Sequence, residues 1–145
     1  MLFFLLVFAV IDFGRFIYIR NIAFRDAEAA ARAMATYSDS DCAAWTAARA
    51  NGNPGAITVD ATSIQGDPPP GPGFPAAPGP NQGTLYLYPA MATTATCASG
   101  GPSRPSNTKV EAVVIYSFSP LTPLVARIVG DIQIIAVDNV SITEY

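Results

Sequence analysis

The first part of the chain is its longest stretch without a turn signal. It opens with eleven consecutive apolar residues, continues through Asp12, Gly14, Arg15 and Arg20, and ends in an alanine-rich segment with scattered charges. No proline occurs in it. This pattern predicts one long helix over residues 1–38. Its first half is apolar on almost every side and must therefore be covered.

Several positions in this helix carry specific expectations. Asp12 and Arg15 are three residues apart, so they can pair on one turn, as can Glu28 and Arg32 at a spacing of four. Gly14 costs about 1 kcal/mol relative to alanine, and we expect it to mark a close approach of another backbone or a bend. The alanines of the second half allow either close helix–helix packing or packing on the rest of the chain.

The apolar opening is a poor match to a signal peptide and to a finished membrane span. A basic n-region and a small-x-small cleavage site are missing. Residues 1–11 cover only about 17 Å of a roughly 30 Å bilayer core. Extension of the span to Phe24 brings Asp12, Arg15 and Arg20 into the hydrocarbon core. Insertion of each of these charges costs about 2.5–3.5 kcal/mol. Either the chain continues upstream, or the segment is buried against other protein.

Short segments separated by turns follow the long helix. Residues 38–41 suit the cap of a short helix over 42–50, and residues 56–65 alternate as a strand. Prolines and glycines crowd residues 66–83, which predicts an exposed polyproline-like loop.

The strongest strand signals lie in the second half. Strands are expected at 84–89, more weakly at 92–98, and at 109–118, where one face carries Val110, Ala112, Val114, Tyr116 and Phe118. Thr122 and Pro123 start a short helix that Gly130 ends, and residues 131–145 form one long strand or two. The fold class is therefore α+β: a long N-terminal helix, pilin-like in outline, that carries a small antiparallel sheet as a head over residues 39–145.

The composition of the chain argues against several classes of function. A formal net charge of −3 argues against a nucleic-acid partner. The chain has no histidine, which removes the commonest general base and metal ligand, and its carboxylates are scattered. We expect no enzymatic activity, no metal and no cofactor.

Two cysteines, Cys42 and Cys97, are too few for a zinc site. They suit one disulfide in an oxidising, extracytoplasmic compartment, with a stabilisation of about 4 kcal/mol in the chain-entropy model. The alternative is a pair of buried free thiols.

The run VFAVIDFGRFIYIRNIAFRDAEAAARAMA resembles the N-terminal region of TadE-like pseudopilins of tight-adherence (Tad), type IV-like pili, in which an apolar run leads into the motif found here at Asp12–Arg15. The tail from residue 113 also looks like the closing pattern of that family. The resemblance implies export as a prepilin through the cytoplasmic membrane, cleavage by a prepilin peptidase, contact with inner-membrane assembly machinery and a place in a cell-surface filament. Leu5 stands where a mature pilin usually carries a glutamate.

The leading hypothesis is a structural subunit that polymerises with copies of itself through the N-terminal helix. In such a bundle Asp12 could be neutralised by Arg15, by a neighbour's arginine or by a neighbour's N-terminal amine, and the pairing would fix the axial register. The expected assembly residues are Leu2, Phe3, Phe4, Leu6, Phe8, Ile11, Asp12, Phe13, Gly14, Arg15, Phe16, Ile17 and Arg20.

Two alternatives differ in class. A minor pseudopilin or membrane-anchored assembly factor would use the same helix in few copies. A secreted ligand-binding module would use the head aromatics Trp45, Tyr86 and Tyr88, which are more often core residues.

Overall fold

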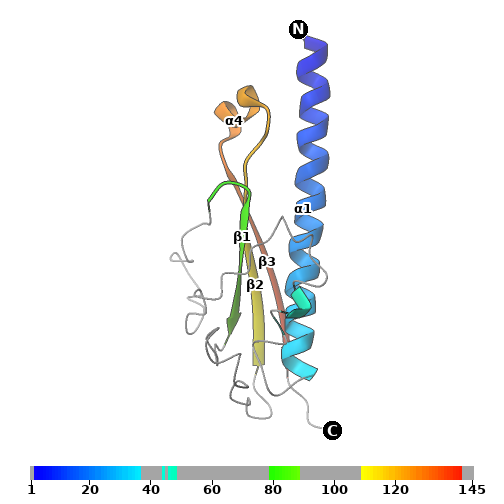
Figure 1. Cartoon of the computed structure of the whole chain (residues 1–145), viewed down its shortest axis with the longest axis vertical. Helices are drawn as coiled ribbons and strands as arrows, with labels where there is room; N and C mark the ends of the chain where they lie inside the picture. Colours follow the sequence, from blue (N-terminus) through cyan, green and yellow to red (C-terminus); the bar gives the residue numbers. More distant parts are fainter. Residues whose placement is uncertain (1, 37–43, 45, 49–78, 89–108, 142–145) are drawn as a thin grey trace.

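The computed structural model describes residues 2–36, 44, 46–48, 79–88 and 109–141. In chain order the elements are α1 (Leu2–Thr36), β1 (Gln82–Tyr88), β2 (Lys109–Phe118), α4 (Pro123–Val129) and β3 (Ile132–Ser141). A long rod, α1, lies beside a narrow sheet, and its N-terminal end extends past the sheet and past α4 (Figure 1). The α+β class is therefore confirmed, with one long helix and a small antiparallel sheet.

The sheet has the order β1-β2-β3, and both pairs are antiparallel. β2 spans the same residues that its alternating pattern predicts. β1 begins earlier than expected, because Asn81 adopts a left-handed backbone (φ 57°) and its N–H donates to the Ser117 carbonyl at 2.7 Å. Gln82 and Gly83 are therefore strand residues, and the prediction that the loop extends through residue 83 is wrong at its end.

The sequence leaves open whether the C-terminal segment forms one long strand or two, and the structure shows one. β3 runs without a break through Asp138 and Asn139, which pair with Ala112 and Glu111 of β2. Before it, α4 begins after Thr122 and ends at Gly130, as the sequence predicts; Gly130 has a φ of 70°, a conformation that favours glycine.

One face of the sheet packs against α1. The predicted inward face of β2 is buried there, from Val110 to Phe118 at every second residue. The sheet-facing stripe of α1 alternates steps of three and four residues. It comprises Asp12, Phe16, Ile19, Ala23, Asp26 and Ala30. Most alanines of α1 are therefore buried on the head of their own chain, which was one of the two alternatives.

The other face of the sheet carries a second buried cluster. Tyr86 and Tyr88 of β1 lie there with Val113 and Ile115 of β2. Both tyrosines are at most 5% exposed. They are core residues, which is the more common role of such aromatics, and they do not form an exposed binding surface.

Several predictions fall outside the described residues. Residues 44 and 46–48 are helical, in agreement with a helix over 42–50. The Cys42–Cys97 disulfide, the caps at 38–41, the strands at 56–65 and 92–98, Trp45 and most of the proline-rich loop remain predictions.

Candidate functional site

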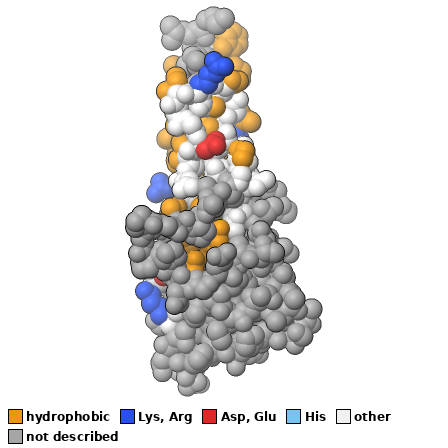
Figure 2. Space-filling view, turned by 90° about the vertical axis from the view of Figure 1, so that its left-hand side faces the viewer, with side chains coloured by type: hydrophobic (Ala, Val, Ile, Leu, Met, Phe, Trp, Pro, Cys, Tyr) orange, Lys and Arg blue, Asp and Glu red, His pale blue; other side chains and the backbone are white. Residues whose placement is uncertain are grey.

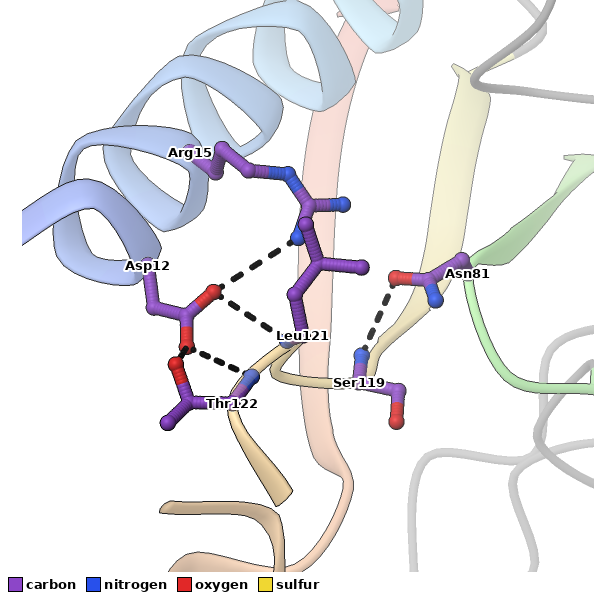
Figure 3. Close-up of polar contacts among 6 residues, drawn as sticks. All are labelled: Asp12, Arg15, Asn81, Ser119, Leu121 and Thr122. Atoms are coloured by element: carbon purple, nitrogen blue, oxygen red, sulfur yellow. Dashed lines mark hydrogen bonds and ion pairs between the residues drawn. The ribbon is translucent and has the colours of Figure 1, made fainter. Parts of the chain in front are cut away.

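The carboxylate of Asp12 joins the N-terminal third of α1 to the start of α4 (Figure 3). Its Oδ1 accepts the Leu121 backbone N–H at 3.1 Å, and its Oδ2 accepts the Thr122 N–H at 3.1 Å and the Thr122 hydroxyl at 2.6 Å. Thr122 occupies the N-cap position of α4 but makes no side-chain cap of its own, since its hydroxyl donates to Asp12. The acid of α1 thus fixes the approach to α4.

Arg15 extends this network. Its Nη1 lies 3.7 Å from Asp12 Oδ1, which confirms the predicted pair, and its guanidinium lies 5.6 Å from the centre of the Phe118 ring. Phe16 meets the same ring edge-on, with ring centres 5.5 Å apart. Nη1 is buried without a hydrogen bond. The positive charge is therefore held between one carboxylate and one aromatic face.

Hydrogen bonding decides the ionisation of Asp12. Burial by itself would raise the pKa of this carboxyl, but the Thr122 hydroxyl, the Leu121 and Thr122 amides and the Arg15 charge outweigh it, so that the pKa lies below its ordinary value of 3.8. Asp12 is ionised at neutral pH and has its partners within its own chain. The burial of Asp12 is therefore explained without a charged group from a neighbouring copy.

α1 carries exposed apolar side chains on both sides of Asp12 along the chain. Figure 2 shows hydrophobic groups along both sides of the narrow end of the molecule. The exposed ones are Phe3, Phe4, Leu6, Phe8, Val10, Ile11, Phe13, Ile17, Tyr18 and Phe24. Of the expected assembly residues, Gly14 and Arg20 are also exposed, Phe16 and Arg15 turn partly toward the head, and the side chain of Leu2 is outside the described set.

A groove lies where the rod meets the loop before α4. It has a volume of about 350 Å³ and is lined by Phe8, Ile11, Asp12, Leu121, Thr122 and Pro123. A more polar hollow of about 400 Å³ lies lower on the rod and is lined by Arg25, Glu28, Ala29, Arg32 and Ala47. Glu28 and Arg32 form the predicted ion pair there. The groove beside Asp12 is the more apolar of the two.

Gly14 has no close neighbour among the described residues. A Cβ built on it meets no atom within 4 Å. The described part of the chain therefore does not make the expected close approach of another backbone, and α1 continues through the glycine as an α-helix.

A second acid on the sheet-facing stripe went unrecognised in the sequence. Asp26 lies fourteen residues after Asp12 and is 1% exposed, and its Oδ1 has no hydrogen-bond partner. Burial raises its pKa from 3.8 to about 6. Its charged neighbours in sequence suggest an exposed position; only its place three residues after Ala23 and seven after Ile19 indicates the buried side.

Residues able to hold a metal do not gather in the described part of the chain: no three His, Cys, Asp or Glu side chains lie close enough together. Within the same residues, no helix is long and apolar enough to cross a membrane. No family model matches the chain, and no curated protein or solved structure is significantly similar to it.

Proposed function

We propose that this chain is a pilin-like structural subunit that polymerises through α1 into an extracellular filament of the type IV-like (Tad) kind. The observation that carries the proposal is the N-terminal half of α1. It extends past the sheet as a helix (Figure 1), and its large apolar side chains are exposed along its length.

The exposed area is large for a protein that remains alone. Four phenylalanines, Phe3, Phe4, Phe8 and Phe13, are 48% to 71% exposed, which leaves on the order of 500 Å² uncovered. These four rings point to several sides of the helix, so a single neighbour cannot cover all of them. The neighbouring aliphatic residues raise the total toward the roughly 800 Å² per partner of a stable interface.

The free energy gained by covering these rings is comparable to the cost of association. At about 25 cal/mol per Å², covering the four rings alone contributes on the order of 12 kcal/mol. The loss of translational and rotational freedom costs about 4–15 kcal/mol for each association. Contacts that cover the whole exposed stretch are therefore needed for a lasting polymer.

The position of Asp12 supports a protein environment for this helix. Asp12, Arg15 and Arg20 interrupt the apolar half of the rod, and Asp12 makes its hydrogen bonds to the head of its own chain. The rod and the head therefore form one unit through this anchor.

The resemblance at Asp12–Arg15 supplies the pilus assignment and its route. On that assignment the chain is a prepilin in the cytoplasmic membrane before assembly, is cleaved by a prepilin peptidase, and is added to the filament by inner-membrane machinery. Its final location is the cell surface. A minor pseudopilin present in few copies would share this route and differ in stoichiometry.

Composition of sheared surface filaments tests the proposal. We expect this polypeptide to be the main component by mass spectrometry; a trace amount would indicate the minor subunit, and absence would contradict both. Phe13→Gln is expected to lower filament yield about tenfold, because it removes an exposed ring from the rod. Ile128→Gln, which changes an exposed residue of α4, is the matched control and should leave the yield unchanged.

A further inference from the structure

The far side of the rod carries a regular apolar stripe, here called the rear stripe. Its residues alternate steps of three and four, and all are 42% to 71% exposed: Phe3, Leu6, Val10, Phe13 and Ile17. Such spacing is the pattern that one helix presents to another helix along a straight seam. The sheet-facing stripe has the same spacing but begins at Asp12 and packs on the head. The rear stripe is therefore a second seam, and no described part of the chain covers it.

The groove beside Asp12 lies on another side of the rod. At 100° per residue, Phe8 and Ile11 of the groove point about 120–180° away from the centre of the rear stripe. Leu121 and Pro123 complete the groove from the loop before α4, and the side chain of Leu121 is 66% exposed. One rod thus carries two different apolar surfaces on nearly opposite sides.

This arrangement favours an open polymer over a closed pair. A single self-complementary patch joins two copies and leaves nothing to extend. With two different surfaces on opposite sides, each copy can bind one neighbour through the first surface and another neighbour through the second. The same contact then repeats from copy to copy. Gly14 lies four residues after Val10 and three before Ile17, at the edge of the rear stripe. Its missing side chain opens space for a neighbour, since no described residue of its own chain lies within 4 Å of a Cβ at that position.

We infer that the rear stripe of one copy packs into the groove beside Asp12 of a second copy, with the two rods parallel. The groove is level with residues 8–12, so the start of the neighbour's rear stripe enters it when the rods are staggered by about four or five residues, or roughly 7 Å. Leu6 of one copy then faces Leu121 of the next. This inference rests on the proposed function and adds the surfaces and the stagger.

A charge swap across the predicted contact tests it. Leu6→Glu and Leu121→Lys each place one charge in an apolar contact and should each lower filament yield about tenfold. Combined in one chain they should restore the yield to within about threefold of the wild type, because each glutamate then meets a lysine of the next copy. Circular dichroism and thermal melting of the monomers check that each variant is folded.

The control pairs Leu6→Glu with Ile128→Lys, which changes a residue on α4 outside the groove. This pair should remain as defective as Leu6→Glu alone. Equal rescue by both pairs, no rescue by Leu121→Lys, or unaffected filaments in the single variants would overturn the inference and leave the proposed function standing. A wild-type chain that forms no filament would overturn both.

Discussion

The carboxylate of Asp12 accepts both the backbone N–H and the hydroxyl of Thr122, at 3.1 Å and 2.6 Å. The two residues are 110 positions apart in the chain. These bonds therefore fasten the loop before α4 to the rod (Figure 3). C-terminal to Asp12, one side of α1 packs against the sheet, whereas Phe13 and Ile17 on the opposite side stay exposed.

Loss of this anchor should loosen the start of α4. Asp12→Ala removes three hydrogen bonds to a charged acceptor and is expected to destabilise the monomer by about 2–4 kcal/mol. The amides of Leu121 and Thr122 should exchange with solvent much faster, as measured by hydrogen exchange. Glu28→Ala, at an exposed ion pair, is the control and should change stability by less than about 0.5 kcal/mol.

A double-mutant cycle separates the hydroxyl contact from the rest of the anchor. Thr122→Val keeps the shape of the side chain and removes only the donor at 2.6 Å. It should cost about 1–2 kcal/mol in wild type and much less in the Asp12→Ala background. Equal costs in both backgrounds would mean that the hydroxyl acts independently of Asp12.

The two buried acids of α1 give opposite dependences of stability on pH. The pKa of Asp12 is lowered by folding, so its contribution is present above its ordinary pKa of 3.8 and is lost as the pH falls through the folded value. The pKa of Asp26 is raised to about 6, so its cost is absent below 3.8 and grows until the pH passes about 6. Between them, stability should be greatest near pH 4–5.

Replacement of Asp26 isolates the contribution of this acid to the pH dependence of stability. The shift from 3.8 to about 6 corresponds to a cost on the order of 3 kcal/mol at pH 7. Asp26→Asn should therefore be more stable than wild type at pH 7, with a difference that shrinks toward pH 4, measured by denaturant unfolding. Glu28→Gln, at an exposed site, should show no such trend; a constant difference for Asp26→Asn across this range would contradict burial of the ionised acid.

Gly14 should separate folding from assembly. Gly14→Ala removes the entropic cost of glycine from a helix and meets no atom within 4 Å, so the monomer should gain up to about 1 kcal/mol in thermal unfolding. The same methyl group occupies the space at the edge of the rear stripe. Filament yield should fall although the monomer is more stable, and an unchanged yield would show that the neighbour does not approach there.

The parts of the fold that were predictable are those in which one period dominates. β2 alternates with period two along its whole length, and α1 has no residue that could stop it before its polar end. α4 is framed by Thr122, Pro123 and Gly130, whose backbone preferences act locally. Such signals need no knowledge of distant residues.

The parts that were missed depend on distant contacts. Asp12 was recognised as an acid in an apolar helix, but its partners at residues 121 and 122 belong to a turn brought beside it only by the sheet. Asp26 sits in a segment whose charges suggest solvent, yet packing turns it inward. β1 starts early because Asn81 bonds to Ser117, a pairing that exists only once the two strands meet.

A helical reconstruction of filaments sheared from wild-type cells tests the central claim most directly. The account predicts that this polypeptide repeats along the filament, that residues 3–17 of α1 lie in its interior against neighbouring copies, and that Asp12 keeps its bonds to Thr122 of the same chain. Filaments built from another polypeptide, or subunits whose residues 3–17 face solvent in the assembled state, would contradict it.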